Sequence, residues 1–339
     1  MQATRIALDV MGGDRAPDAI LRGAVAACSP LGKLRIAPER LLLVGDEQLI
    51  RTRLSELGSD LAFAVRHASQ VVGMGESPAT ALRAKPDSSI ASMILALKAG
   101  EAGAAVSMGN TGAVVGAATL MLGTLPGVRR PGIAVTLDLT GHPLTIIDMG
   151  ANIAPKPEHL LQYAVMGSVY MRDCLGKSSP RVGLLNIGEE ESKGTDLLKA
   201  AHESLRSAPV HFVGNLEGND LFRDKADVVV TDGFTGNVVL KLMEEFASFL
   251  LRQSVKELEA QGIRGAGEAL SNVRSSVDYS EYGGALLLGV SGVVVIGHGR
   301  SDENAVANAV GLAARALDAH VNEDIVAGLQ RASSPQGAS

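Results

Sequence analysis

The sequence has few of the side chains with which proteins bind nucleic acids. Aromatic residues make up 3% of the 339 residues, and tryptophan is absent. The 31 lysines and arginines are outnumbered by 37 aspartates and glutamates, so the formal net charge is −6 at pH 7. Nucleic-acid-binding domains rely on stacked aromatic side chains and on basic surfaces. We therefore expect no nucleic-acid partner.

Cysteine is scarce as well, and long apolar runs are missing. Cys28 and Cys174 are far from any CxxC spacing, which argues against a disulfide framework or a zinc site. The first residues, MQATRIALDV, lack the basic region and apolar core of a signal peptide. No stretch reaches the roughly 20 apolar residues that a membrane-spanning helix needs. These absences predict a cytoplasmic protein.

Several catalytic motifs are also missing. The chain has no GxxxxGKS or GxxxxGKT, no GxGxxG after its first apolar run, no GxSxG and no HExxH. ATP hydrolysis, a standard dinucleotide fold, a serine esterase and a zinc protease therefore lose support. We expect neither a metal ion nor another cofactor.

Apolar strand-like runs alternate with helix-like segments along most of the chain. IALDVM precedes PDAILRGAVAAC, and DVVVTD precedes GNVVLKLMEEFASFLL. Continuous apolar runs are typical of strands that are buried on both faces, as in a parallel sheet with crossover helices. In GIAVTLDLTGHPLTIIDM two β-rich runs flank the turn residues TGHP, which predicts an inserted antiparallel hairpin. The fold class is thus α/β, a mostly parallel sheet with helices on both faces.

The length and composition fit a compact enzyme. Hydrophobic residues make up 46% of the chain, and its 39 glycines suit many tight turns. We predict a single α/β catalytic unit over residues 1–331, with two lobes divided near residues 130–155 as the alternative. The polar residues 332–339 are expected to form a flexible tail.

Glycines and small polar residues follow the predicted strands, where parallel sheets bind ligands. Glycine lets backbone N–H groups approach a ligand, and a helix start presents unpaired N–H donors, so such segments suit anions. A capped turn without a ligand explains SMGNTGA equally well when it is taken alone. The recurrence of the pattern favours one shared site, which would include SMGNTGA (107–113), NIGEEESKG (186–194), DGFTGN (232–237) and GHGRS (297–301).

Six motifs resemble the bacterial phosphate acyltransferases of phospholipid synthesis. They are ALDVMGGD (7–14), VSMGNTGA (106–113), KPEHLLQYAVMGSVY (156–170), VGLLNIGEEESKG (182–194), FVGNLEGND (212–220) and DVVVTDGFTGNVVLK (227–241). The resemblance extends from about residue 5 to residue 318. It implies acyl transfer from acyl carrier protein to inorganic phosphate, and a homodimer. It also implies the fold of phosphate acetyltransferases and of isocitrate and isopropylmalate dehydrogenases.

The resemblance and the loop chemistry together suggest roles for individual residues. Lys193, Asn237 and Asn110 are the expected catalytic residues, with Lys193 neutralising charge and Asn237 donating to phosphate or to an oxyanion. For Lys193, a solvated ion pair with its glutamate neighbours is the alternative. A histidine held in a turn is the alternative for His298. The expected substrate-binding residues are Gly109, Thr111, Gly112, Asp148, Asn152, Asn186, Asp232 and His298.

Four cations are candidates for meeting the acidic carrier protein, where charge complementarity would mainly raise the association rate. They are Arg83, Lys85, Arg129 and Arg130, and surface solvation is the alternative for each. The helical series 238–260 and the following IRGAGEALSNVRSSV suggest a peripheral contact with the inner face of the membrane, or a helical pair that forms the dimer. A glycerol-3-phosphate acyltransferase is a further expected partner.

The chain departs from the family pattern at four positions. Arg15 and Met108 stand where the family usually has His and Ala, and Ile296 and Gly297 stand where Lys and Ser commonly precede HG. The family's cation at position 296 is therefore not carried over. Two other classes stay open, a dehydrogenase of the same architecture and a non-enzymatic scaffold for lipid-synthesis enzymes.

Overall fold

The computed structural model describes residues 4–30, 32, 34–270 and 279–333. Within them the chain divides into two compact units. The first unit combines the residues up to Pro131 with those from Tyr282 onward, and the second is Gly132–Glu281. Of the predicted tail, residues 332 and 333 end a helix, and residues 334–339 lie outside the described part of the chain.

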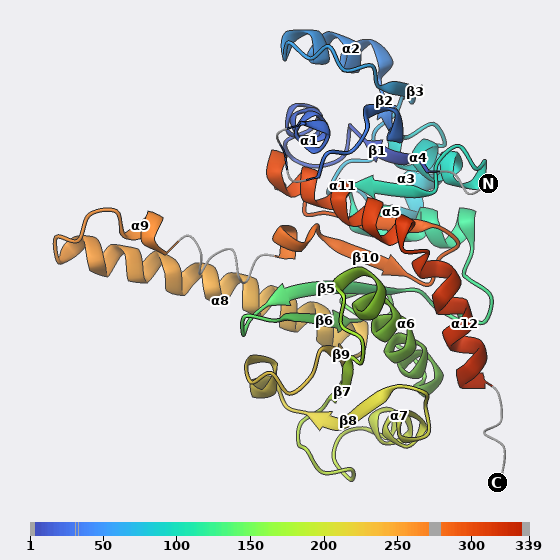
Figure 1. Cartoon of the computed structure of the whole chain (residues 1–339), viewed down its shortest axis with the longest axis vertical. Coiled ribbons are helices and arrows are strands. Elements are labelled where there is room, and N and C mark those ends of the chain that lie inside the picture. Colours follow the sequence, from blue (N-terminus) through green and yellow to red (C-terminus); the bar gives the residue numbers. More distant parts are fainter. Residues whose placement is uncertain (1–3, 31, 33, 271–278, 334–339) are drawn as a thin grey trace. The chain divides into compact units, whose positions relative to one another are not determined.

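The first unit is built on a mostly parallel sheet in the order β3-β2-β1-β4-β11-β10 (Figure 1). Only β10 in this unit's described sheet runs antiparallel to its neighbour, β11. The bounds are β1 (Ile6–Asp9), β2 (Leu41–Gly45), β3 (Ala64–His67), β4 (Ala104–Ser107), β10 (Ala285–Leu288) and β11 (Val293–Ile296). Nearly all residues of these strands except those of β3 are buried, as their continuous apolar runs predict.

The chain reverses direction across this sheet at β1. It moves outward from β1 to β2 and β3 and then returns to β4 on the other side of β1. Because parallel crossovers are right-handed, this reversal puts α1 and α2 on one face and α4 on the other. The helices are α1 (Asp18–Cys28), α2 (Glu47–Glu56), α3 (Pro78–Ala84), α4 (Ser89–Lys98), α5 (Thr111–Ala117), α11 (Glu303–Asp318) and α12 (Val321–Ser333).

The second unit has the sheet order β5-β6-β9-β7-β8. The predicted hairpin is confirmed, because β5 and β6 are antiparallel with Ala134 opposite Ile147, whereas the other strand pairs of this sheet are parallel. The strands are β5 (Gly132–Asp138), β6 (Pro143–Ile147), β7 (Arg181–Leu185), β8 (His211–Leu216) and β9 (Val228–Val230). The helices are α6 (Pro157–Leu175), α7 (Asp196–Arg206), α8 (Gly233–Ala260) and α9 (Ala266–Ala269).

Polar residues that follow the strands also begin the helices. The side chain of Asp46 accepts a hydrogen bond from Leu49 N–H at the start of α2, and Asp302 accepts one from Ala305 N–H at the start of α11. A side-chain oxygen at this position satisfies a backbone donor that has no partner within the helix. Capping thus accounts for part of the polar pattern after several of the strands.

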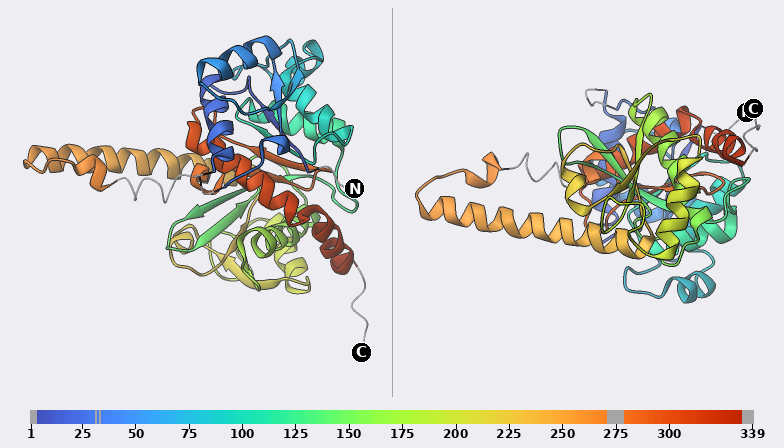
Figure 2. Two further views of the ribbon diagram at one scale, coloured as in Figure 1. Left: turned by 45° about the horizontal axis from the view of Figure 1, so that its top comes forward. Right: turned by 90° about the horizontal axis from the view of Figure 1, so that it is seen from below.

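Helix α8 is long and largely uncovered within the second unit. Gly233 and Gly236 are its only buried residues. Figure 2 shows that the far turns of α8 extend beyond the sheet of their own unit, with α9 beside them. The predicted membrane-contacting turn lies partly outside the described residues, at 271–277. Within the described part of the chain, no helix combines the length and the apolar character needed to cross a membrane.

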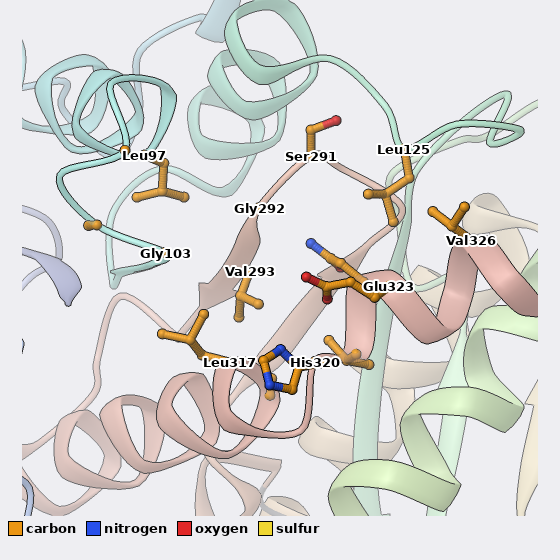
Figure 3. A pocket seen from close by; sticks show the side chains of 15 residues that line it. Leu97, Gly103, Leu125, Ser291, Gly292, Val293, Leu317, His320, Glu323 and Val326 are labelled. Carbon is orange, nitrogen blue, oxygen red and sulfur yellow. The ribbon is translucent and has the colours of Figure 1, made fainter. Parts of the chain in front are cut away.

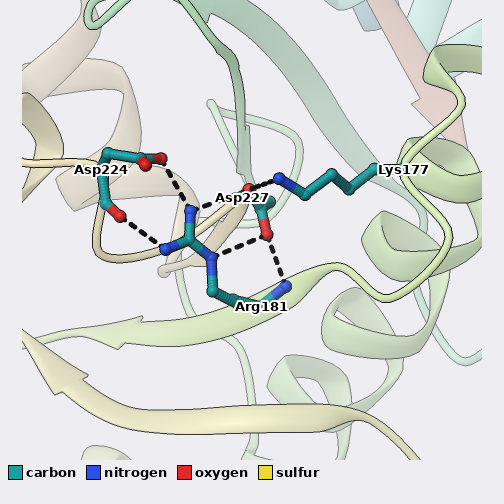
Figure 4. Close-up of polar contacts among 4 residues, drawn as sticks. All are labelled: Lys177, Arg181, Asp224 and Asp227. Atoms are coloured by element: carbon teal, nitrogen blue, oxygen red, sulfur yellow. Dashed lines mark hydrogen bonds and ion pairs between the residues drawn. The ribbon is translucent and has the colours of Figure 1, made fainter.

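An ion-pair network joins the amino-terminal ends of β7 and β9 (Figure 4). The Asp227 side chain is 2% exposed and accepts hydrogen bonds from Arg181 Nε at 3.0 Å and Arg181 N–H at 2.7 Å. Lys177 Nζ lies 3.1 Å from the same carboxylate, and Arg181 also pairs with Asp224. Burial works to raise the pKa of Asp227, but the donors of Arg181 and Lys177 outweigh it and lower the pKa.

We expect Asp227→Asn to lower the free energy of unfolding by about 1–3 kcal/mol at neutral pH, because it weakens charge-assisted hydrogen bonds. A lowered folded-state pKa means that this stability is present above the unfolded-state pKa of about 3.9 and is lost as the pH falls through the folded-state value. The difference in the free energy of unfolding between wild type and variant should therefore shrink in strong acid. Urea denaturation at pH 7 and near pH 3 measures it, and an equal difference at both would contradict the prediction.

Candidate active site

Polar loops in the first unit follow the ends of β1 and β4, where the strand order reverses. Ligands of open α/β sheets bind in the crevice outside such a switch point. MGGD follows β1 and MGNTG follows β4. The loop after β11 joins them, because Asp14 N–H donates to the carbonyl oxygen of Gly299 at 2.7 Å. His298, in the same loop, is exposed, and its Nδ1 accepts from Arg300 N–H at 3.1 Å.

Asn110 connects the GNTG loop to a segment that the sequence did not single out. Its Oδ1 accepts from Ala113 N–H at 3.0 Å and caps α5. Its Nδ2 lies 3.3, 3.1 and 3.0 Å from the carbonyl oxygens of Gly73, Met74 and Glu76. These partners are more than thirty residues away along the chain, so no local motif reports them. The Asn110 amide is thereby engaged on both sides and holds segment 73–76 beside Gly109, Thr111 and Gly112.

The same segment is held by one of the predicted carrier-protein contacts. Lys85 Nζ donates to Val71 O at 2.8 Å and pairs with the carboxylate of Glu76. The hydrogen bonds from Lys85 and Gly73 lower the pKa of Glu76. Arg83, Arg129 and Arg130 are exposed, which fits both contact with the carrier protein and simple solvation at the surface.

Two of the departures from the family pattern touch each other. Met108 is 1% exposed and packs against Gly13 and Gly297. A Cβ placed on Gly297 would overlap Met108 Sδ, and one placed on Gly13 would lie 3.1 Å from Met108 Cβ. The methionine thus occupies the space that a side chain at position 297 would need, so Met108 and Gly297 form one complementary change.

We expect Gly297→Ser to destabilise the protein by about 1–3 kcal/mol, the usual cost of overpacking a filled interior. Met108→Ala in the same chain should recover most of that loss, because it vacates the space. Thermal melts of the two single variants and the double variant measure the coupling. Losses that simply add would show that the two positions are independent.

In the second unit, the loop after β6 is folded around the carboxylate of Asp148. Asp148 is fully buried. Its Oδ1 accepts from the N–H groups of Ile133, Gly150 and Ala151 at 3.0, 3.0 and 2.9 Å, and its Oδ2 accepts from Asn152 N–H at 2.7 Å. Burial raises the pKa of Asp148 even with these donors. The carboxylate is therefore occupied by the backbone of its own unit.

The first turn of α8 lies against this loop because two glycines permit the approach. Asp232 caps α8 through Thr235 N–H at 2.9 Å, and Gly233 N–H donates to Asn152 O at 3.0 Å. A Cβ on Gly236 would overlap the carbonyl oxygen of Asp148. The close approach also brings Asn237 next to Gly150. A Cβ added to Gly150 would lie 3.6 Å from Asn237 Cβ. The structure thus gathers four predicted residues, Asp148, Asn152, Asp232 and Asn237.

Lys193 lies in the loop after β7, and β7 pairs with β9. Asn186, which is buried, accepts from Ile187 N–H at 2.8 Å and donates to the carbonyl oxygen of Lys193 at 3.2 Å. The Lys193 side chain is exposed. Lys193 and Asn237 thus follow neighbouring parallel strands at the same edge of the second sheet, and a common reaction centre stays a prediction.

The cavity in Figure 3 lies elsewhere in the first unit. It has a volume of about 450 Å³ and is lined by Gly103 and Val293, which lie at the starts of β4 and β11. Leu125, Leu317 and His320 also line it. The predicted site residues of the first unit follow the opposite ends of these strands, and no predicted site residue lines the cavity. In the described residues, no group of three His, Cys, Asp or Glu side chains is arranged to hold a metal ion.

Sequence comparison relates the chain to one family over nearly its whole length. Residues 4–324 match the family described as "Fatty acid synthesis protein". The phosphate acyltransferase of Heliobacterium modesticaldum is 45% identical over 333 residues, which is 96% of each chain. The phosphate acyltransferase of Desulforudis audaxviator is 44% identical over 330 residues, again 96% of each chain.

Structure comparison relates the chain to more distant proteins. A phosphotransacetylase from Streptococcus pyogenes has a TM-score of 0.60 with this chain at 15% identity, over 93% of this chain and 94% of the other. Identity at this level supports a likeness of fold alone. The predicted fold class is confirmed by this likeness and by the mostly parallel strands.

Proposed function

The chain belongs to the fatty acid synthesis protein family, in which its relatives are phosphate acyltransferases, and from this premise we propose how it works as an acyltransferase of lipid biosynthesis. The acyl donor is fatty acyl carrier protein, the acceptor is inorganic phosphate, and the product is acyl phosphate for phospholipid synthesis. The observation that carries the proposal is the match to phosphate acyltransferases over 96% of the chain.

The reaction needs no protein nucleophile. A phosphate oxygen attacks the thioester carbonyl, the new carbon–oxygen bond forms, and the carbon–sulfur bond breaks. The sulfur leaves as a thiolate, which takes up a proton to become the free carrier-protein thiol. Because a thiol has a pKa of about 8.5, the thiolate is a tolerable leaving group without a strong general acid. The protein's task is then to position phosphate against the carbonyl and to stabilise the oxyanion.

The loops at the carboxyl ends of the strands suit that task. In the first unit, the N–H groups of Thr111 and Gly112 at the start of α5 are donors for an anion, Gly109 lets the backbone approach it closely, and Asn110 positions these residues. His298, in the neighbouring loop after β11, is a further substrate-binding residue. In the second unit, Asn237 donates to phosphate or to the oxyanion, and Lys193 neutralises charge. Their neighbours orient them, namely Asp148, Asn152, Asn186 and Asp232.

Lys193→Ala and Asn237→Ala test whether these two residues serve one transition state. Each single variant should lose roughly 10²–10³ in kcat, because a charge-assisted contact to the developing charge is removed. The double variant should lose much less than the product of the two losses, since groups that act together are not additive. Steady-state acyl-phosphate formation from palmitoyl carrier protein measures all three.

Lys199→Ala is the matched control, because it removes an exposed lysine on α7 from the same unit. It should keep the wild-type kcat. A Lys193→Ala variant that behaves like Lys199→Ala would remove Lys193 from the reaction centre, and strictly multiplicative losses would mean two independent roles.

We propose that α8 forms the homodimer. Large apolar residues recur along one face of this helix, and their exposed fractions range from 46% to 66%. Apolar residues spaced three or four positions apart form a continuous stripe, and such a stripe marks an interaction surface. A second copy of α8 would cover it. The stripe consists of Phe234, Val238, Leu242, Phe246, Phe249 and Leu250.

Phe246→Asp should shift the protein toward the monomer, because it puts a charge into the interface. Ser248→Asp adds the same charge outside the stripe and should stay dimeric. Sedimentation velocity measures the mass of each. Flotation with anionic phospholipid vesicles tests peripheral membrane contact as the other use of α8. If Phe246→Asp stays dimeric but loses vesicle binding, the stripe serves the membrane instead.

Two further partner assignments complete the proposal. Arg83, Arg129 and Arg130 would meet the acidic carrier protein, and Lys85 would support segment 73–76 through its ion pair with Glu76. A glycerol-3-phosphate acyltransferase would consume the acyl phosphate on the inner face of the membrane. This protein, as a cytoplasmic enzyme with peripheral membrane contact, would supply the acyl phosphate there.

A further inference from the structure

Asp9 is a fully buried acid at the switch point of the first unit, and no role in the reaction has been assigned to it so far. It is the last residue of β1, which lies between β2 and β4. An uncompensated carboxylate in the interior is costly, so hydrogen-bond donors must surround it. Burial raises the pKa of Asp9 in spite of the donors it has.

The carboxylate of Asp9 joins two loops. Its Oδ1 accepts from Met11 N–H at 3.1 Å, which sets the start of the MGGD loop. Its Oδ2 accepts from Ser107 Oγ at 2.7 Å, and Ser107 Oγ in turn accepts from Gly109 N–H at 3.0 Å. A continuous path of hydrogen bonds therefore runs from Asp9 through Ser107 to the first glycine of GNTG.

Gly12, in the MGGD loop, packs against both Asp9 and Gly109. A Cβ on Gly12 would lie 2.5 Å from Asp9 Oδ2, 2.8 Å from Gly109 N and 2.9 Å from Gly109 Cα. The backbone of the MGGD loop is thus packed directly on the peptide of Gly109, which only glycine at position 12 allows. Ser107 is fully buried as well, so neither side chain of the path is placed to touch a substrate.

We propose that Asp9 is a positioning residue for the transferase, which acts through Ser107 to fix the backbone of Gly109 and the anion-binding start of α5. This inference rests on the proposed function. The second unit has a comparable arrangement. Asp148 is a buried acid that directly follows β6, and its carboxylate accepts hydrogen bonds from the backbone of the loop after it. In both loops the acid determines where backbone donors lie.

The test compares variants that cut the path at different points. Asp9→Asn replaces an acceptor oxygen, and Ser107→Ala removes the hydroxyl. Each should lower kcat on the order of 10²-fold, because small displacements of a positioning group have effects of this size. The KM for palmitoyl carrier protein should change little. The double variant should lose no more than the worse single variant, since both changes cut one path. Ser107→Thr keeps the hydroxyl and should recover most of the activity.

Asp227→Asn is the matched control, because it alters another buried aspartate at the opposite end of a strand. It should lower thermal stability while keeping kcat. Asp9→Asn with wild-type kcat, multiplicative losses in the double variant, or equal losses in Ser107→Ala and Ser107→Thr would each overturn the inference. If Asp9→Asn fails to fold, the two Ser107 variants decide. A wild type that forms no acyl phosphate would instead refute the proposed function.

Discussion

A carboxylate that is removed from water must be surrounded by hydrogen-bond donors, and this requirement shapes loops of both units that carry predicted site residues. Asp148 collects four backbone N–H groups, and the chain must bend around it to supply them. Asp9 accepts from Met11 N–H and reaches the next loop through Ser107. In each unit, a buried acid converts a flexible glycine-rich segment into one with a defined backbone, which is what anion binding by N–H groups needs.

Close backbone packing is a second feature that the loops of the two units share. Gly236 allows the first turn of α8 to lie on the carbonyl of Asp148, and Gly12 allows the MGGD loop to lie on Gly109. The amino-terminal ends of β7 and β9 are held differently, by the ion pairs of Asp227 with Arg181 and Lys177. Within the second unit, the predicted reaction centre and this ion-pair network thus lie at opposite ends of the strands. Changes at Asp227 can therefore affect folding without reaching the loops.

Direct attack by phosphate explains why the loops carry amides, glycines and a lysine but no activated serine or cysteine. The nucleophile is a substrate, so catalysis depends on donors that are already oriented when charge develops. Asn110 illustrates the point, because its amide binds the carbonyl groups of segment 73–76 and caps α5. We expect such a residue to contribute through the backbone that it fixes, and the pair of Lys85 and Glu76 fixes the same segment.

The amino-acid sequence was enough to predict the α/β class, the hairpin of β5 and β6 and the loops that follow the strands, because apolar periodicity and turn residues are local signals. It also identified Asn110, Asp148 and Asp232 as polar loop residues that could face a ligand, with a capped turn as the alternative for the loop of Asn110. The long-range partners of the side chains follow only from the folded chain. The partners of Asn110, the path from Asp9 to Gly109 and the fit of Met108 to Gly297 all join residues distant in sequence, and such contacts exist only once the strands have paired and the helices have packed.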